Sequence, residues 1–300
     1  MALDVAEWCA RHLAVPVVAT LFETGHLSRV MGLRLADGRQ VVVKVRPDSD
    51  RLAGCVRVQE ALWRVGFPAP QPILGPVGEA GWAVTVEAHL PGGSVAPASE
   101  PASRAAALLA RFVAEAPDAG DIGTLAPAPA WTAWDHDGPG LWPAPDDRVA
   151  DLNAPEHAVP WLDEGAARVR RRLSAFAAGQ RLVVGHGDWE AQNLRWAGDE
   201  PLAVHDWDSV IVAPEAAVVG LAAAVWPCGV VTRPATVDES AEFLDRYQHW
   251  AGRQFSADEV EASWAAGLWV DLFNTRKAAL DAVPWLSPDE AATRLRLAGA

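Results

Sequence analysis

The stretch from residue 183 to residue 209, VVGHGDWEAQNLRWAGDEPLAVHDWDS, constrains the fold more than any other part of the chain. Short apolar segments alternate in it with polar turns, which is the pattern of buried strands joined by tight connections. The first turn carries Asp188 and Asn193, and a later apolar segment ends at Asp206. Oxygen ligands at the ends of neighbouring strands can surround one point, and they suit a hard cation such as Mg²⁺. The stretch therefore predicts a cation site at the edge of a small sheet.

Phosphoryl transfer needs this combination of groups, because metal ions neutralise the phosphates while a carboxylate positions the acceptor hydroxyl and takes its proton. In this interpretation Asp188 serves the acceptor, and Asn193 and Asp206 hold the metal. Simpler explanations exist for each residue taken singly, since Asp and Asn side chains favour turns. His186, which lies between two glycines, is better explained as a structural, hydrogen-bonded histidine than as a base. A catalytic site is favoured because these residues occur together at this spacing.

The patterning along the whole chain predicts two lobes and an α+β fold. Residues 17–47 alternate as three strands with a hairpin signal at Asp37-Gly38, residues 48–66 are typical of a helix, and extended chain follows. A Pro-, Gly- and Ser-rich segment then marks a boundary. We expect a nucleotide-binding lobe over residues 1–90, a mainly helical lobe over residues 91–300, and a hinge near residues 86–93.

The composition of the chain limits the classes of binding partner and the cellular compartment that we expect. The formal charge of −14 argues against nucleic acid. No apolar run approaches the roughly 20 residues that a membrane-spanning helix needs, and the acidic start is unlike a signal peptide. The three cysteines are scattered, which suits reduced thiols. We expect a cytoplasmic protein without a membrane partner, and a monomer and a homodimer are equally compatible with the sequence.

The spacing of His186, Asp188 and Asn193 (HxDxxxxN), with Asp206 following 13 residues later, resembles the aminoglycoside phosphotransferase/choline kinase family. HGDWEAQN is similar to its catalytic loop, and VHDWDS is similar to its metal-binding segment. The resemblance implies a bilobal protein-kinase-like fold, with a small antiparallel β-rich N-lobe carrying one helix and a larger, mainly helical C-lobe. It also implies Mg²⁺ and ATP as cofactors, with GTP left open, and His186 as support for the catalytic loop.

The same resemblance assigns roles in the N-lobe. Lys44, one of only two lysines in the chain, is similar to the lysine that contacts the α- and β-phosphates. Glu60 is similar to the helix glutamate that pairs with this lysine. Further ATP-binding positions are the loop that covers the phosphates and the segment that meets the adenine, represented by Gly25, Ser28, Glu87 and Ala88.

The identity of the acceptor substrate is the part of the function that the sequence determines least. Residues 117–160, where it should bind, match no substrate class, and the family's usual Gly-Asp-Pro after the metal aspartate is replaced by IVAPEAAVVG. Acidic and aromatic residues suit a cationic sugar, so the candidates for acceptor binding are Trp134, Trp264, Asp271 and Asn274. An alternative is that they are packing residues of the core.

These observations predict an ATP-dependent phosphotransferase that acts on a hydroxyl of a small molecule, with an aminoglycoside or other aminosugar as one candidate. Two alternatives remain open: a kinase of an ordinary metabolite such as a sugar, an amino alcohol or a natural-product intermediate, and a non-catalytic nucleotide-binding protein.

Overall fold

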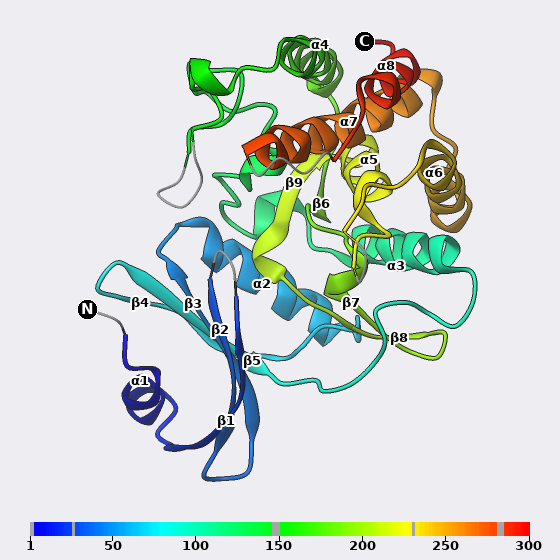
Figure 1. The fold of residues 1–300 in the computed structure, drawn as a ribbon. Helices are drawn as coiled ribbons and strands as arrows, with labels where there is room; N and C mark the ends of the chain where they lie inside the picture. The colour runs from blue at the N-terminus through cyan, green and yellow to red at the C-terminus, as the bar shows by residue number, and fades with distance from the viewer. Residues whose placement is uncertain (1–2, 26–27, 146–150, 230–231, 281–284) are drawn as a thin grey trace.

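The computed structural model describes residues 3–25, 28–145, 151–229, 232–280 and 285–300. The chain forms a sheet-rich N-terminal lobe and a larger, mainly helical C-terminal lobe (Figure 1). The N-terminal lobe is built on an antiparallel sheet with strand order β1-β2-β3-β5-β4. Its strands are β1 (Val17–Thr24), β2 (Arg29–Leu35), β3 (Gln40–Pro47), β4 (Pro72–Glu79) and β5 (Trp82–Ala88).

Strand β3 is buried on both faces from Val41 to Arg46, although this run includes two basic residues. Val43 packs in a hydrophobic core with Trp8 of α1 (Val5–His12). Because successive strand residues point to opposite faces, Lys44 and Arg46 lie on the other face, where they line a small cavity against the neighbouring helix. The sheet thus turns an apolar face to α1 and a cationic face toward the rest of the molecule.

Helix α2 (Arg51–Arg64) lies at the junction of the lobes, where it contacts β4 and also packs against the core of the C-terminal lobe. Its buried residues Cys55, Val58 and Leu62 join the larger hydrophobic cluster, whereas the sheet packs with α1 in a separate cluster. Residues 1–90 carry two helices where the sequence predicted one: α1 covers the apolar face of the sheet, and α2 lies between the sheet and the C-terminal lobe.

The C-terminal lobe is organised around two buried helices that pack on each other, α5 (Glu215–Val225) and α7 (Ala257–Leu280). Capping boxes begin α6 (Val237–Ala251) and α8 (Pro288–Leu297), from Thr236 to Glu239 and from Ser287 to Glu290. The remaining α-helices of the described lobe are α3 (Pro101–Glu115) and α4 (Pro160–Ala177). None of the helices in the described ranges is both long enough and apolar enough to span a bilayer.

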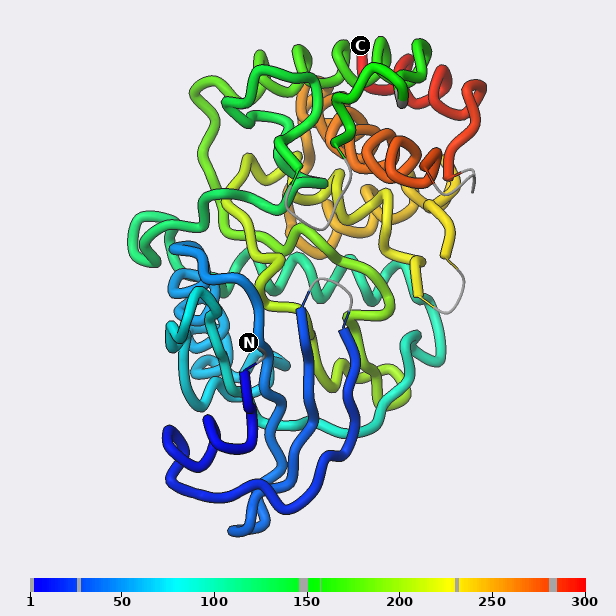
Figure 2. The backbone as a smooth tube through the Cα atoms, turned by 60° about the vertical axis from the view of Figure 1, so that its left-hand side comes forward, coloured from blue at the N-terminus to red at the C-terminus, as the bar shows by residue number. Residues whose placement is uncertain are grey.

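Two small antiparallel ribbons carry the motif-rich stretch of the chain. They are β6 (Leu182–His186) with β9 (Val210–Pro214), and β7 (Leu194–Ala197) with β8 (Glu200–Val204). Figure 2 shows this yellow-green part of the chain running where the blue strands meet the C-terminal helices. The ribbons therefore bring their connecting loops to the junction of the lobes.

Candidate active site

The two ribbons bring the polar loop after β6 against the turn that precedes β9. At the end of the β6–β9 pairing, the Gly187 amide donates to the Ser209 carbonyl oxygen (2.7 Å). A Cβ atom at Gly187 would lie 2.8 Å from the Thr132 side chain and 3.1 Å from Ser209 O. Only glycine fits at position 187, where the loop lies this close to Thr132 and Ser209. Packing therefore explains the second glycine of the Gly-His-Gly sequence.

His186 is fully buried and supports the loop through both ring nitrogens. Nδ1 accepts a hydrogen bond from the Asp188 amide (3.2 Å), and Nε2 donates to the His205 carbonyl oxygen (3.1 Å). Burial lowers the pKa of His186 to about 4. The ring is therefore neutral and joins the two loops as a structural element.

Asp188 and Asn193 are in direct contact. The Asn193 amide group donates to the Asp188 carboxylate (2.8 Å) and to the Asp188 carbonyl oxygen (3.0 Å). Burial raises the pKa of Asp188 well above its usual value, and repulsion from Glu190 and Asp206 raises it further. The carboxylates predicted from the sequence are thus close enough to repel one another, as a cation site requires.

Asp206 adopts a left-handed backbone conformation (φ 61°) and accepts a hydrogen bond from the Ser209 hydroxyl (2.7 Å). Burial and the neighbouring Asp208 raise the pKa of Asp206 to about 7, while Lys44 acts in the opposite direction. Asp208 has a depressed pKa despite its burial, because Arg46 and Lys44 stabilise its charge. The charges of both lobes therefore meet at this turn.

Lys44 is paired with Glu87 rather than with Glu60. Its Nζ lies 3.1 Å from Glu87 Oε1, and the Gln59 side chain donates to the other oxygen of Glu87 (2.8 Å). Burial alone would lower the pKa of Lys44, but Glu87 and Asp208 raise it above the usual value. The lysine is a buried, fixed cation.

The expected Lys44–Glu60 pair is wrong for a geometric reason. Glu60 points away from the sheet and pairs with Arg64 one helical turn later (2.6 Å), with 42 % of its side chain exposed. The preceding residue, Gln59, occupies the buried face of α2 instead. Glu87 pairs with Val42 across β3 and β5, so it shares a face with Lys44. Knowledge of this strand pairing would have identified it, whereas helix spacing could not.

The remaining predicted ATP positions are only partly described. Gly25 has φ +135°, and a Cβ there would lie 1.7 Å from the Ser28 carbonyl oxygen, so the turn between β1 and β2 requires glycine. Residues 26–27 at its tip lie outside the described residues. The Ala88 amide donates to Gln71 O (2.9 Å). That amide is therefore already engaged, and an adenine contact would use other backbone groups of this segment.

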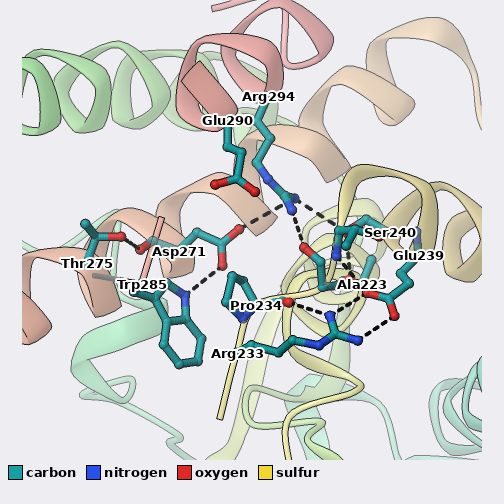
Figure 3. Close-up of polar contacts among 12 residues, drawn as sticks. Ala223, Arg233, Pro234, Glu239, Ser240, Asp271, Thr275, Trp285, Glu290 and Arg294 are labelled. Atoms are coloured by element: carbon teal, nitrogen blue, oxygen red, sulfur yellow. Dashed lines mark hydrogen bonds and ion pairs between the residues drawn. The ribbon is translucent and has the colours of Figure 1, made fainter. Parts of the chain in front are cut away.

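Three of the four candidate acceptor residues belong to the core, which corrects the prediction. Asp271 is fully buried, accepts a hydrogen bond from Trp285 (3.1 Å) and pairs with Arg294 (3.5 Å; Figure 3). Trp134 and Trp264 are also buried. Helical spacing correctly grouped Trp264 and Asp271 on one helix, α7. That helix is packed against α4, α5 and α8, so these side chains face the core and not a ligand. Only Asn274 is partly exposed, and its acceptor role stays a prediction.

The donor set fits a magnesium ion that is shared with phosphates. Within the described ranges, no group of three or more His, Cys, Asp and Glu side chains could hold a metal by itself. The partly buried Asp206 carboxylate and the side chain of Asn193 on the adjoining loop offer hard oxygen donors. Mg²⁺ is usually held by one or two carboxylates together with substrate phosphates. The residues present suit that mode better than a metal cage made only of protein ligands.

The pH dependence of this site should respond to Glu190. Since the charge of Glu190 raises the pKa of Asp188, Glu190→Gln should lower that pKa and move the acid limb of kcat/KM to lower pH. The check is a pH–rate profile of any phosphoryl transfer, with the exposed Glu200→Gln as control. An acid limb that stays in place, or moves to higher pH, would refute the assignment of Asp188 as the titrating group.

The fold and the site together define a kinase-type phosphotransferase for small molecules. The model described as "Phosphotransferase enzyme family" matches residues 18–266, and the chain belongs to this family. This confirms the resemblance and the enzymatic class inferred from the sequence. No curated protein matches the chain significantly.

Solved structures that are similar to this chain include kinases and phosphotransferases that act on small molecules. An amicoumacin kinase in complex with AMP-PNP has a TM-score of 0.60 and 14% identity, over 98% of this chain and 91% of that chain. A thermostable aminoglycoside phosphotransferase APH(4)-Ia with ADP and hygromycin B has a TM-score of 0.55 and 15% identity, over 99% and 97%. A macrolide 2′-phosphotransferase from Brachybacterium faecium has 0.53 and 17%, over 99% and 97%. These likenesses confirm the bilobal α+β, protein-kinase-like fold.

Proposed function

We propose that the protein transfers the γ-phosphoryl group of ATP to a hydroxyl of a small molecule. Residues 1–90 would form the nucleotide-binding lobe, and residues 91–300 would carry the catalytic loop and the acceptor site. One observation carries the proposal: Asp188, Asn193 and Asp206 share a partly buried site within electrostatic reach of Lys44. This set provides both a phosphate-binding cation and an acceptor-positioning carboxylate.

Each group has a distinct role in this proposal. Asp188, a carboxylate whose pKa is raised by burial, orients the acceptor hydroxyl and takes its proton. Lys44, fixed by Glu87, binds the phosphates. Asn193 and Asp206 would hold Mg²⁺, which when bound supplies positive charge against the transferring phosphoryl group. Most of the acceleration comes from positioning and from electrostatic preorganisation.

An antibiotic-like acceptor with a sugar hydroxyl is the leading candidate. Structures of the same fold carry names that refer to hygromycin B, macrolides and amicoumacin. A kinase of an ordinary metabolite uses the same chemistry and is the second candidate. A non-catalytic nucleotide binder is the weakest, because the catalytic and metal positions are all filled and brought together.

The experiment is an ADP-release screen with Mg·ATP and four acceptor classes: aminoglycosides, macrolides, simple sugars and amino alcohols. ADP release that depends on an antibiotic would support the leading candidate, and release with sugars or amino alcohols alone would support the second. Tight binding of ATP without acceptor-dependent ADP release from any class would favour the nucleotide binder and count against the proposal.

The partner of Lys44 can be identified kinetically. Glu87→Gln should lower kcat/KM for ATP about tenfold or more, since hydrogen bonds to charged groups contribute about 1.5–3 kcal/mol. The matched Glu60→Gln should stay within roughly twofold, because exposed ion pairs contribute little. Steady-state kinetics at varied ATP concentration decides between them. A larger loss in Glu60→Gln than in Glu87→Gln would restore the original assignment.

A further inference from the structure

Arg46 crosses the junction of the lobes to reach the turn after Asp206. It is the single arginine of β3, is 7 % exposed, and forms an ion pair with Asp208 (2.5 Å). A cavity of about 20 Å³ beside this pair is also lined by Lys44 and Glu87. The two ion pairs at the junction, Lys44–Glu87 and Arg46–Asp208, therefore adjoin.

Arg51 reaches the same turn from α2. Its guanidinium group, in a side chain that is nearly buried, donates to the carbonyl oxygens of Leu125 (3.2 Å), Val210 (2.6 Å) and Asp208. A buried charge is costly unless hydrogen bonds compensate it, and here the compensation comes from the backbone on both sides of Ser209. Two arginines of the N-terminal lobe therefore bind this turn: Arg46 binds the Asp208 side chain, and Arg51 binds the main chain.

The turn that the two arginines hold contacts both functional loops. Ser209 donates to Asp206 through its hydroxyl group (to Oδ2, 2.7 Å) and through its amide (to O, 2.9 Å). Its own carbonyl oxygen accepts from the Gly187 amide (2.7 Å), next to Asp188. A displacement of the turn would therefore move the metal-binding carboxylate relative to the catalytic loop.

Asp206 also needs such support. Its φ of 61° places an L-residue in the left-handed region, which is sterically disfavoured for residues other than glycine. Strained residues persist where the surroundings determine their conformation, and they gather at functional sites. The contacts around residues 206–210 include the two arginines, so they are placed to maintain this conformation.

We propose that Arg46 and Arg51 are positioning residues that hold Asp206 in its metal-binding geometry, so that the metal site is complete only when the N-terminal lobe is docked. The inference rests on the proposed function. It predicts that these arginines act on metal affinity, whereas binding of metal-free nucleotide, which depends on Lys44, is unaffected by them.

The test measures nucleotide affinity by calorimetry, with AMP-PNP at a series of Mg²⁺ concentrations and in excess chelator. Arg46→Met and Arg51→Met should raise the Mg²⁺ concentration for half-maximal enhancement of binding by about 10–100-fold, the usual effect of removing groups that orient metal ligands. Affinity in chelator should stay within roughly twofold of wild type, as expected for a phosphate contact left intact. Arg46→Lys, which keeps the charge, should recover part of the loss.

The matched control is Arg57→Met, which removes another arginine of α2 that bonds a carbonyl oxygen of the C-terminal lobe, that of Ile122 (2.9 Å). It should leave the Mg²⁺ dependence unchanged even if it lowers Tm. Asp208→Asn should reproduce Arg46→Met, and the double variant should add little, since both remove one interaction.

The inference and the proposed function fail in different ways. Mg²⁺-dependent binding in the wild type, together with unchanged titrations of Arg46→Met and Arg51→Met, would overturn the inference alone. An equal loss in Arg57→Met would also overturn it, because the effect would then be one of general docking. Nucleotide binding that ignores Mg²⁺ in the wild-type protein would overturn both.

Discussion

Asp188→Asn is expected to lower kcat by about 10²–10⁴-fold, the usual contribution of a positioned general base, while the affinity for ATP stays near that of the wild type. The substitution keeps the size of the side chain and removes only its charge and basicity. The Asp188 side chain accepts a hydrogen bond from the Asn193 amide group, and the side-chain oxygen of an asparagine can accept the same bond. The measurement is steady-state turnover beside calorimetric binding of ATP.

Asp199→Asn is the control for this variant. It makes the same chemical change at a carboxylate that bonds Ser99 and Arg104, away from the catalytic loop, and should retain turnover within roughly twofold, as expected for a surface ion pair. Turnover of Asp188→Asn within a few-fold of wild type would show that another group takes the proton. Loss of ATP affinity together with turnover would instead indicate a damaged nucleotide site.

Asp271→Leu is expected to reduce the free energy of unfolding by about 3–5 kcal/mol, the usual cost of breaking a buried ion pair by removing one partner. The carboxylate is fully buried against Arg294, itself 2 % exposed, and against Trp285 (Figure 3). Arg294 cannot lose its proton in a protein, so the variant leaves an uncompensated cation in the core. Urea unfolding measures the loss.

The double variant Asp271→Leu/Arg294→Met separates charge from packing. It removes both charges and should recover most of the stability lost by Asp271→Leu. The exposed pair provides the comparison, since Arg64→Met breaks the contact with Glu60 and should cost less than about 1 kcal/mol. A double variant no more stable than Asp271→Leu would mean that shape, rather than charge compensation, dominates at this position.

The sequence predicted the parts of the site that lie close together along the chain. His186, Asp188, Asn193 and Asp206 fall within two short ribbons whose connections are tight, so their spacing alone determines which side chains meet. The same reasoning yielded the division into a sheet-rich and a mainly helical lobe. Local patterns suffice where the partners are joined by short connections.

Contacts between distant segments were beyond this reasoning. Glu87 reaches Lys44 only because β5 inserts between β3 and β4, and Gln59 faces that pair because of the rotation of α2. Likewise, the sequence of α7 alone suggests that Asp271 is available to a ligand. In the structure its carboxylate is paired with Arg294 of α8. The pairing of strands and the packing of helices decide these positions, and neither follows from the periodicity of one segment.

Transfer of labelled γ-phosphate from Mg·ATP to an acceptor, with wild type and Asp188→Asn side by side, tests the central claim most directly. The account predicts label on the acceptor in equal amount to ADP with the wild-type protein, and at most a trace with Asp188→Asn. Equal labelling by both proteins, or hydrolysis to free phosphate without any labelled acceptor, would contradict it.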